Sequence, residues 1–193
     1  MQLENIRWIG HASFILEDKE GNNICFLDPF ESGNVREKSD IIFITHGHFD
    51  HCSEVDVKRL LTPETVVVAA PNCIEKFPIP NKQTKIVEPN ITFAVKNLVV
   101  KTIPAYNIRP ERLNYHPRKN EWVGYIININ GKKIYHAGDT DFVDEMTELG
   151  KIDIAMLPIG GTYTMDAEEA IEAANTIKAK ITVPMHYKRL LGD

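Results

Sequence analysis

The chain has 193 residues, of which 43% are hydrophobic and 25% are charged. These fractions lie near the averages of globular domains, so the composition excludes collagen-like, low-complexity and disulfide-dense chains. The length is close to that of one domain and too short for two full-sized ones. We therefore expect a single domain over residues 1–193.

The chain carries 22 Lys and Arg residues against 27 Asp and Glu residues, a formal charge of −5. This excess of acid disfavours nucleic-acid binding, which depends on neutralising phosphates. No apolar stretch approaches the roughly 18 to 20 residues that span a bilayer, and the first residues lack the pattern of a signal peptide. Three widely spaced cysteines favour a reducing compartment. We expect a cytoplasmic protein with no membrane span and no nucleic-acid partner.

In chain order, short runs rich in β-branched and aromatic residues predict strands. These runs are residues 6–9, 13–17, 24–27, 41–45, 65–70, 91–95, 98–103, 122–129, 133–136, 152–157 and 181–183. Several runs, such as residues 41–44 and 66–68, are apolar on both faces. Such strands should be covered above and below.

Helical signals are fewer. A capping box at Ser53 precedes one helix, and Asp166 with Glu169 opens another that runs toward Lys178. Residues 72–77 and 142–149 are shorter candidates. Strands that do not alternate strictly with helices predict an α/β (α+β) fold with helices outside two packed sheets.

Residues 104–121 form the one long irregular stretch, with three prolines. A loop of this length in a compact domain is more often functional than idle. Because it lacks apolar periodicity, we expect it to be exposed and to act as a mobile lid.

The segment from residue 46 to residue 51 reads H-G-H-F-D-H. Neutral imidazole and carboxylate are good ligands for Zn²⁺, Mn²⁺ or Fe²⁺. Directly after the predicted strand 41–45, with Gly47 permitting an unusual turn, His46 and His48 can bend toward one ion. Asp50 and His51 can then face a second ion. The alternative is a polar turn that only caps the strand.

Residues 45–51 read T-H-G-H-F-D-H, residues 136–140 read H-A-G-D-T, and residues 184–186 read P-M-H. These three segments, in this order, resemble the signature motifs of the metallo-β-lactamase-fold superfamily. Residues 8–14, W-I-G-H-A-S-F, and 160–166, G-G-T-Y-T-M-D, resemble more narrowly a branch of metal-dependent hydrolases. That branch is related to L-ascorbate-6-phosphate lactonase and N-acyl-phosphatidylethanolamine phospholipase D.

The resemblance implies an αββα four-layer sandwich of the metallo-β-lactamase type with a dinuclear metal site. It implies that His46 and His48 hold metal 1, that Asp50, His51 and His186 hold metal 2, and that Asp139 bridges the two. Zn²⁺ is the first candidate, and Mn²⁺ or Fe²⁺ are the alternatives.

The chain departs from the family at the third ligand of metal 1. Many relatives place a histidine just after the strand that corresponds to residues 98–103, where this chain reads P-A-Y-N. His116 in the long loop is the nearby substitute, unless it is a solvated loop residue. His11 has either a substrate or supporting role or a packing one, and Asp28 could orient a ligand imidazole. We leave His136 out of the ligand set, and Cys52 is expected to pack at a helix start.

Two ions bridged by a carboxylate can share a hydroxide and present it to a carbonyl or phosphoryl centre, so the expected reaction is hydrolysis. Asp50 or Asp139 could accept the proton, and Tyr163 or His11 could stabilise the oxyanion. Arg109, Arg112, Arg118 and Lys119 give the long loop a cationic excess. We therefore expect a small anionic ester, lactone or phosphodiester as substrate.

Two other functions stay open at this point. One is an iron-dependent redox protein of the same fold, and the other is a metal-binding protein without catalysis. The chain ends seven residues after His186, where relatives usually continue. The sequence therefore leaves open a missing last C-terminal element, its completion by a neighbour, and a homo-oligomer.

Overall fold

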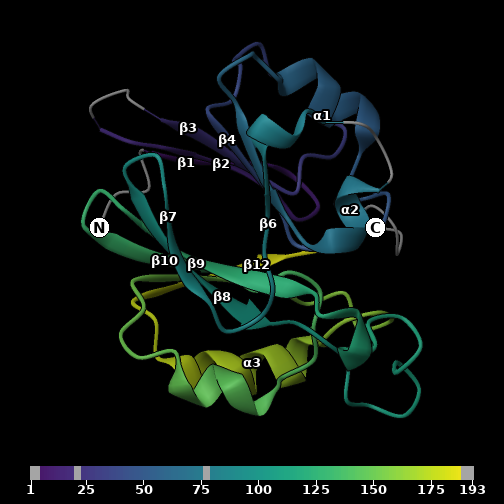
Figure 1. The fold of residues 1–193 in the computed structure, drawn as a ribbon. Helices are drawn as coiled ribbons and strands as arrows, with labels where there is room; N and C mark the ends of the chain where they lie inside the picture. Colours follow the sequence, from purple (N-terminus) through teal and green to yellow (C-terminus); the bar gives the residue numbers. More distant parts are fainter. Residues whose placement is uncertain (1–4, 20–22, 76–78, 188–193) are drawn as a thin grey trace. The chain divides into compact units, whose positions relative to one another are not determined.

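The computed structural model describes residues 5–19, 23–75 and 79–187. The chain divides into two compact units, Met1–Val87 and Glu88–Asp193, and each unit contains one six-stranded mixed sheet (Figure 1). The predicted α/β class is confirmed, while the single domain over residues 1–193 stays a prediction. The C-terminal edge after Tyr187 lies outside the described residues.

In the N-terminal unit the strand order is β1-β2-β3-β4-β5-β6. The first three strands pair antiparallel, and β3 to β6 pair parallel. The elements are β1 (Ile6–Gly10), β2 (Ser13–Glu17), β3 (Ile24–Leu27), β4 (Ile41–Ile44), α1 (Glu54–Leu60), β5 (Val66–Ala69), α2 (Pro71–Ile74), η1 (Asn81–Gln83) and β6 (Thr84–Ile86). Every residue of β4 is fully buried, so this strand is covered on both faces as its apolar run predicted.

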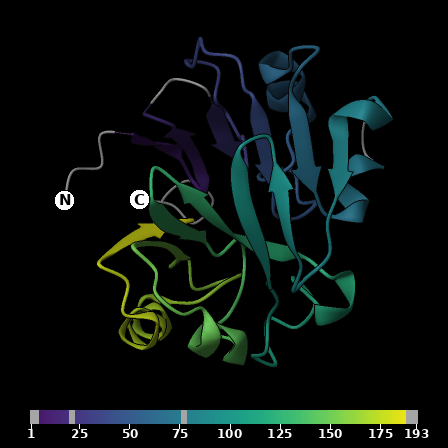
Figure 2. The ribbon, with the colours of Figure 1, turned by 60° about the vertical axis from the view of Figure 1, so that its left-hand side comes forward.

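In the C-terminal unit the strand order is β12-β11-β10-β9-β8-β7. Strands β10, β11 and β12 pair parallel, and the others pair antiparallel. The elements are β7 (Thr92–Val95), β8 (Leu98–Pro104), η2 (Arg118–Asn120), β9 (Val123–Ile129), β10 (Lys132–His136), η3 (Asp144–Glu148), β11 (Ile154–Pro158), α3 (Ala167–Ile177) and β12 (Ile181–Met185). Helix α3 contacts β11 and η3, and Figure 2 shows it nearly end-on.

Both main helices begin at the residues that the sequence predicted. The Ser53 side chain accepts a hydrogen bond from the Asp56 N–H at the start of α1, and Asp166 accepts one from the Glu169 N–H at the start of α3. Each contact satisfies a backbone donor that has no partner within the helix. None of the helices in the described ranges is long and apolar enough to cross a membrane.

The structure differs from the predicted elements at a few places. Strand β6 was not predicted, because three residues are too few for an alternating pattern to appear. The candidate helix at residues 72–77 is α2, Pro71–Ile74, and Phe77 lies outside the described residues. The candidate helix at residues 142–149 is the 3₁₀ helix η3.

The expectation that the loop at residues 104–121 is exposed holds for only part of it, because residues 108–111 and 113–115 are exposed whereas other side chains of the loop are buried. Tyr106, Asn107, Arg112 and His116 are all buried. These side chains form hydrogen bonds and ion pairs inside the C-terminal unit. Such contacts argue against a mobile lid. Polar contacts of this kind leave no apolar periodicity in the sequence.

Parallel strand directions determine where functional side chains gather in each unit. The carboxyl ends of neighbouring parallel strands lie at one edge of a sheet. In the N-terminal unit this edge receives the residues after β3 and β4, and in the C-terminal unit the residues after β10, β11 and β12. Strand β8 also ends at the latter edge, because Pro104 pairs with Val123 and Tyr125 pairs with His136.

We predict that Gly124→Ala destabilises the protein. A Cβ at position 124 would lie 2.7 Å from the His136 carbonyl oxygen and 2.8 Å from that of Ala137, both backbone atoms on the approach to Asp139. Backbone must shift to accept the methyl group, at a cost of about 1 to 3 kcal/mol in the free energy of unfolding. Urea unfolding followed by circular dichroism measures this change.

Gly33→Ala is the matched control, because no atom lies within 4 Å of a Cβ at position 33. Its unfolding midpoint should stay at the wild-type value. Equal midpoints for the two variants would contradict the close approach at Gly124.

Candidate functional site

The predicted site residues of the N-terminal unit gather where β3 and β4 end. Asp28 follows β3, and Thr45 and His46 follow β4. His11 lies in the turn between β1 and β2 and reaches the same edge, because Phe14 pairs with Leu27 at the end of β3. His46, Asp50, His51 and His11 are all buried, and His48 is half-buried.

Asp28 is the centre of hydrogen bonding in this group. Its Oδ1 accepts from the Thr45 N–H at 2.7 Å, and its Oδ2 accepts from Thr45 Oγ1 at 2.7 Å and from His51 Nδ1 at 2.8 Å. The carboxylate is fully buried. Three donors compensate the loss of hydration that a buried carboxylate suffers.

These contacts decide which nitrogen of two imidazoles carries the proton. His51 donates from Nδ1 to a carboxylate, which can only accept. Thr45 gives its single hydroxyl proton to Asp28, so its Oγ1 accepts from His46 Nδ1 at 2.9 Å. In their neutral forms His46 and His51 therefore both present an unprotonated Nε2, the form that binds a metal ion.

The first candidate ligand pair is His46 with His48. His46 Nε2 lies 3.1 Å from His48 Nδ1. Two nitrogens bound to one tetrahedral ion at ~2.0 to 2.1 Å lie roughly 3.4 Å apart. The spacing of this pair fits a shared ion.

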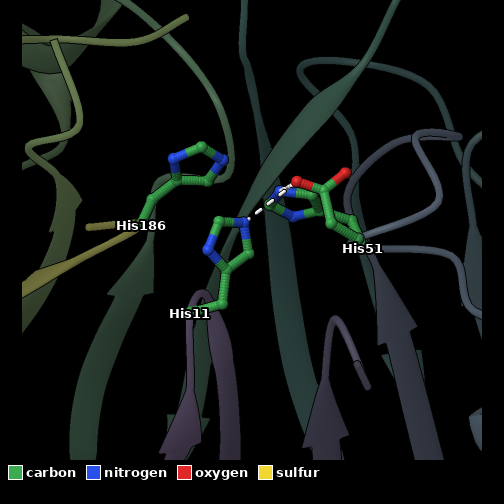
Figure 3. Close-up of side chains that lie close together, drawn as sticks. His11, His51 and His186 are labelled. Carbon is green, nitrogen blue, oxygen red and sulfur yellow. Dashed lines mark hydrogen bonds and ion pairs between the residues drawn. The ribbon is translucent and has the colours of Figure 1, made fainter. Parts of the chain in front are cut away.

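The second group in this unit contains His11, Asp50 and His51. Asp50 Oδ2 lies 3.0 Å from His11 Nε2 and 3.8 Å from His51 Nε2. Figure 3 shows the imidazoles of His11 and His51 close together, with a dashed line from His11 to the carboxylate. The Asp28, His46 and His51 donors also lie close enough together to hold one ion.

Three residues of the predicted site or its support adopt left-handed backbone conformations. The φ angles are 49° at His11, 43° at Asp28 and 57° at His186. Such angles cost a non-glycine residue of order 1 kcal/mol or more, and they concentrate at functional sites. At each position the chain turns sharply just after, or just before, a strand.

The predicted site residues of the C-terminal unit form a cluster around Asp139. Asp139 follows β10 and His186 follows β12, while His116 comes from the loop between β8 and β9. Asp139 Oδ2 lies 2.9 Å from His186 Nε2 and 3.2 Å from His116 Nε2. All three side chains are buried.

His116 is held from behind by Asn107. Asn107 Oδ1 accepts from the His116 N–H at 3.0 Å and from its Nδ1 at 2.9 Å. An amide oxygen only accepts, so Nδ1 of His116 carries the proton and Nε2 is directed at Asp139. His116 is therefore a buried member of the cluster, not a solvated loop residue.

The remaining predicted residues lie as follows. Tyr163 is half-buried in the loop after β11, with its ring edge-to-face against Tyr115 at 4.7 Å. His136 is fully buried in β10, and its Nδ1 accepts from the Gly138 N–H. Cys52 directs its thiol to the Cys73 carbonyl oxygen.

Sequence reasoning missed the residues that support the imidazoles. Thr45 was included in the motif only as a flanking residue, and Asn107, Arg112 and Asp141 were not recognised as a network. Asn107 lies in the P-A-Y-N segment, where the expected histidine is missing, and that departure was the available signal. Its side-chain partners are 9, 34 and 56 residues away, and such distances leave no local pattern.

The loop cations are already engaged within the C-terminal unit. Arg112 is buried against Asp141 and Glu169. Arg118 pairs with Glu145 at 3.0 Å and lies over the Tyr106 ring. Burial of Tyr106, together with its hydrogen bond to Glu145, raises the pKa of its hydroxyl to about 12, so this anchor stays protonated at neutral pH.

The donor set fits a divalent metal ion. Within each unit, imidazole nitrogens and carboxylate oxygens converge, and the inner nitrogens of His46, His51 and His116 are fixed by hydrogen bonds. Hydrogen bonds of this kind orient imidazole ligands in metal sites. Nitrogen and oxygen donors suit zinc, manganese and iron.

Comparison with known proteins identifies the family. Residues 5–186 match the model of the beta-lactamase superfamily domain. The "UPF0173 metal-dependent hydrolase" of Thermoplasma volcanium is 37% identical, with 94% of this chain and 82% of the relative covered. That of Thermoplasma acidophilum is 36% identical, with 96% and 84% covered.

Solved structures agree. A protein from Parabacteroides distasonis ATCC 8503 is 34% identical with a TM-score of 0.86, and the match covers 95% of this chain and 82% of that one. Igni18, a metallo hydrolase from Ignicoccus hospitalis, is 26% identical with a TM-score of 0.75 and the same coverage.

The chain therefore belongs to the metallo-β-lactamase superfamily and, within it, to the UPF0173 family of metal-dependent hydrolases. The predicted family, the metallo-β-lactamase fold and the expectation of an enzyme are confirmed.

We predict that Thr45→Val weakens metal binding. Valine has a similar shape but can neither donate to Asp28 nor accept from His46 Nδ1, so the proton of His46 is no longer held away from Nε2. Loss of such an outer contact typically lowers metal affinity by about 10- to 100-fold. Competition for Zn²⁺ with a chromogenic chelator measures this affinity.

Thr45→Ser keeps the hydroxyl and is the control. It should bind Zn²⁺ nearly as tightly as the wild type. If the valine variant binds as tightly as the serine variant, Thr45 does not orient His46.

Proposed function

We propose that this protein is a hydrolase that works with two divalent metal ions. His46, His48 and His116 would hold one ion, and Asp50, His51 and His186 would hold the other. Asp139 would contribute to both. Zn²⁺ is the first candidate because every donor is an imidazole or a carboxylate, and Mn²⁺ or Fe²⁺ accept the same donors.

One observation carries the proposal of two ions. A single oxygen of Asp139 lies within 3.2 Å of two imidazole nitrogens, one from His116 and one from His186. A carboxylate between two histidines in this way suits a bridging ligand. The pairs in the N-terminal unit, His46 with His48 and Asp50 with His51, supply two further sets of donors.

The residues of the site would have different roles in hydrolysis. When bound, the ions would lower the pKa of a water molecule and polarise the scissile carbonyl or phosphoryl group. Asp50 or Asp139 would receive the proton. His11 contacts Asp50 through Nε2, and His11 or Tyr163 would stabilise the developing oxyanion.

For the substrate we propose a small ester, lactone or phosphodiester, with a preference for an anionic one. Arg112 and Arg118 are paired with carboxylates, so the preference depends on Arg109 and Lys119. Arg109 has a half-exposed side chain 3.9 Å from Glu169. Lys119 is exposed on η2.

The cellular setting is part of the same proposal. All three cysteines are buried thiols, which suits the reducing cytoplasm. We propose a small-molecule substrate without a nucleic-acid partner. Self-association is a separate expectation, which sedimentation of the purified protein would test.

The experiment that tests the function combines metal analysis with a substrate screen. Purified protein should contain close to two equivalents of divalent metal and hydrolyse members of a panel of chromogenic phosphodiesters, phosphomonoesters and lactones. Removal of metal by a chelator should abolish turnover, and Zn²⁺ should restore it. Bound iron with oxygen consumption and no hydrolysis would overturn the proposal in favour of a redox protein.

We predict that Asp139→Asn has the largest effect of any single site variant. The amide keeps the shape of the side chain but loses the charge that two cations require. Metal content should fall from two equivalents to at most one. Turnover should fall by more than the roughly 10- to 100-fold typical of outer contacts.

Asp144→Asn is the matched control, because it removes an exposed carboxylate five positions away. It should keep both metal equivalents and wild-type turnover. Two equivalents and normal turnover in Asp139→Asn would show that Asp139 does not bridge.

A further inference from the structure

The loop between β8 and β9 contains a buried cation. Arg112 is 5% exposed, and its Nη1 donates to Asp141 Oδ1 at 2.8 Å and to Glu169 Oε2 at 2.7 Å. Burial alone would lower the pKa of Arg112, but the two carboxylates outweigh it and raise the pKa above its ordinary value. The guanidinium is therefore a permanent charge that joins the loop to the first turn of α3.

Asp141 accepts hydrogen bonds from residues at the beginning of the same loop. Its Oδ2 accepts from the backbone N–H groups of Ile108 and Arg109 at 2.8 and 2.9 Å. Its Oδ1 accepts from Asn107 Nδ2 at 3.0 Å as well as from Arg112. The carboxylate is fully buried, so its four donors are what make its ionised form tolerable there.

Asn107 connects Asp141 to His116 through hydrogen bonds of its side-chain amide. Its Nδ2 donates to Asp141 Oδ1 and to the Tyr163 carbonyl oxygen. Two acceptors around Nδ2 fix the orientation of the amide, so Oδ1 must face His116. The backbone completes the contact, because the Asn107 N–H donates to the His116 carbonyl oxygen at 2.8 Å.

We propose that Arg112, Asp141 and Asn107 form a relay of positioning residues that fixes the tautomer and direction of His116. In this relay Arg112 holds Asp141, Asp141 holds the amide of Asn107, and Asn107 holds the proton of His116 on Nδ1. Nε2 then has to receive a proton or a metal ion at Asp139. The role toward the metal rests on the proposed function.

This relay explains how His116 can be held rigidly although it lies in a loop. A ligand on a strand end is held by the sheet, but His116 lies in a loop of irregular backbone. Ligands held within a few tenths of an ångström need locked rotamers and a supporting layer of hydrogen bonds. Arg112 and Asp141 supply that layer from inside the unit, so the loop presents its histidine as a fixed part of the site.

The first test uses Asn107→Ala, with Asn114→Ala as the matched control in an exposed part of the same loop. Asn107→Ala should weaken binding of one Zn²⁺ equivalent by about 10- to 100-fold and leave the second equivalent near wild-type affinity. Asn114→Ala should bind both equivalents as the wild type does. Titration with Zn²⁺ against a chelator resolves the two steps.

The second test reads the tautomer without metal or activity. In the metal-free protein, ¹⁵N-detected histidine spectra, assigned with His116→Gln, should show His116 protonated at Nδ1. Asn107→Ala and Arg112→Ala should shift His116 toward the Nε2-protonated form. Arg112→Lys should recover part of the wild-type signal, and Asn114→Ala should leave it unchanged.

The outcomes separate the relay from the proposed function. If the wild type binds no divalent metal, the proposed function fails, while the tautomer measurement still decides on the relay. If the wild type binds two equivalents but Asn107→Ala keeps both affinities and the Nδ1 tautomer, the relay is wrong. Should Arg112→Ala fail to fold, Arg112→Lys and Asn107→Ala carry the test.

Discussion

The proton on the inner nitrogen of the imidazoles is the constraint on which both clusters depend. Histidine binds a metal only through a nitrogen without a proton, and a free ring exchanges its proton between the two nitrogens. In the N-terminal unit Thr45 holds the Nδ1 proton of His46, and Asp28 holds that of His51. In the C-terminal unit Asn107 holds that of His116. In each cluster, hydrogen bonds at Nδ1 thus orient these imidazole rings before a metal ion binds.

Two fully buried carboxylates, Asp28 and Asp141, make this orientation possible. An ionised group without water is tolerable only when several donors surround it, and each of these has at least three. Their donors come from several segments of the chain, so each carboxylate also fixes local backbone. Burial deprives each carboxylate of its hydration, and the hydrogen bonds that replace the lost water also fix the positions of the site loops.

Much of the fold was predictable from the sequence, because strands and helix starts follow from local patterns, whereas the assignment of metal ligands stays a prediction. Strand runs such as residues 13–17 and 24–27 coincide with β2 and β3, and the spacing of His46, His48, Asp50 and His51 indicates ligands. The supporting layer was not predictable. Arg112 and Glu169 lie 57 positions apart, and no periodicity connects a loop arginine to a helix glutamate.

The loop between β8 and β9 explains why hydropathy misleads at this place. Its polar residues Asn107, Arg112 and His116 are nearly fully buried, whereas Ile108, Leu113 and Tyr115 are 49%, 46% and 39% exposed. This reverses the usual arrangement, because the inner side of the loop borders a cluster of carboxylates and imidazoles and not an apolar core. Burial there is stabilised by charge and hydrogen bonding. The polar sequence of such a loop predicts a solvent-exposed lid. In the folded unit, however, its buried polar residues hold His116 in position.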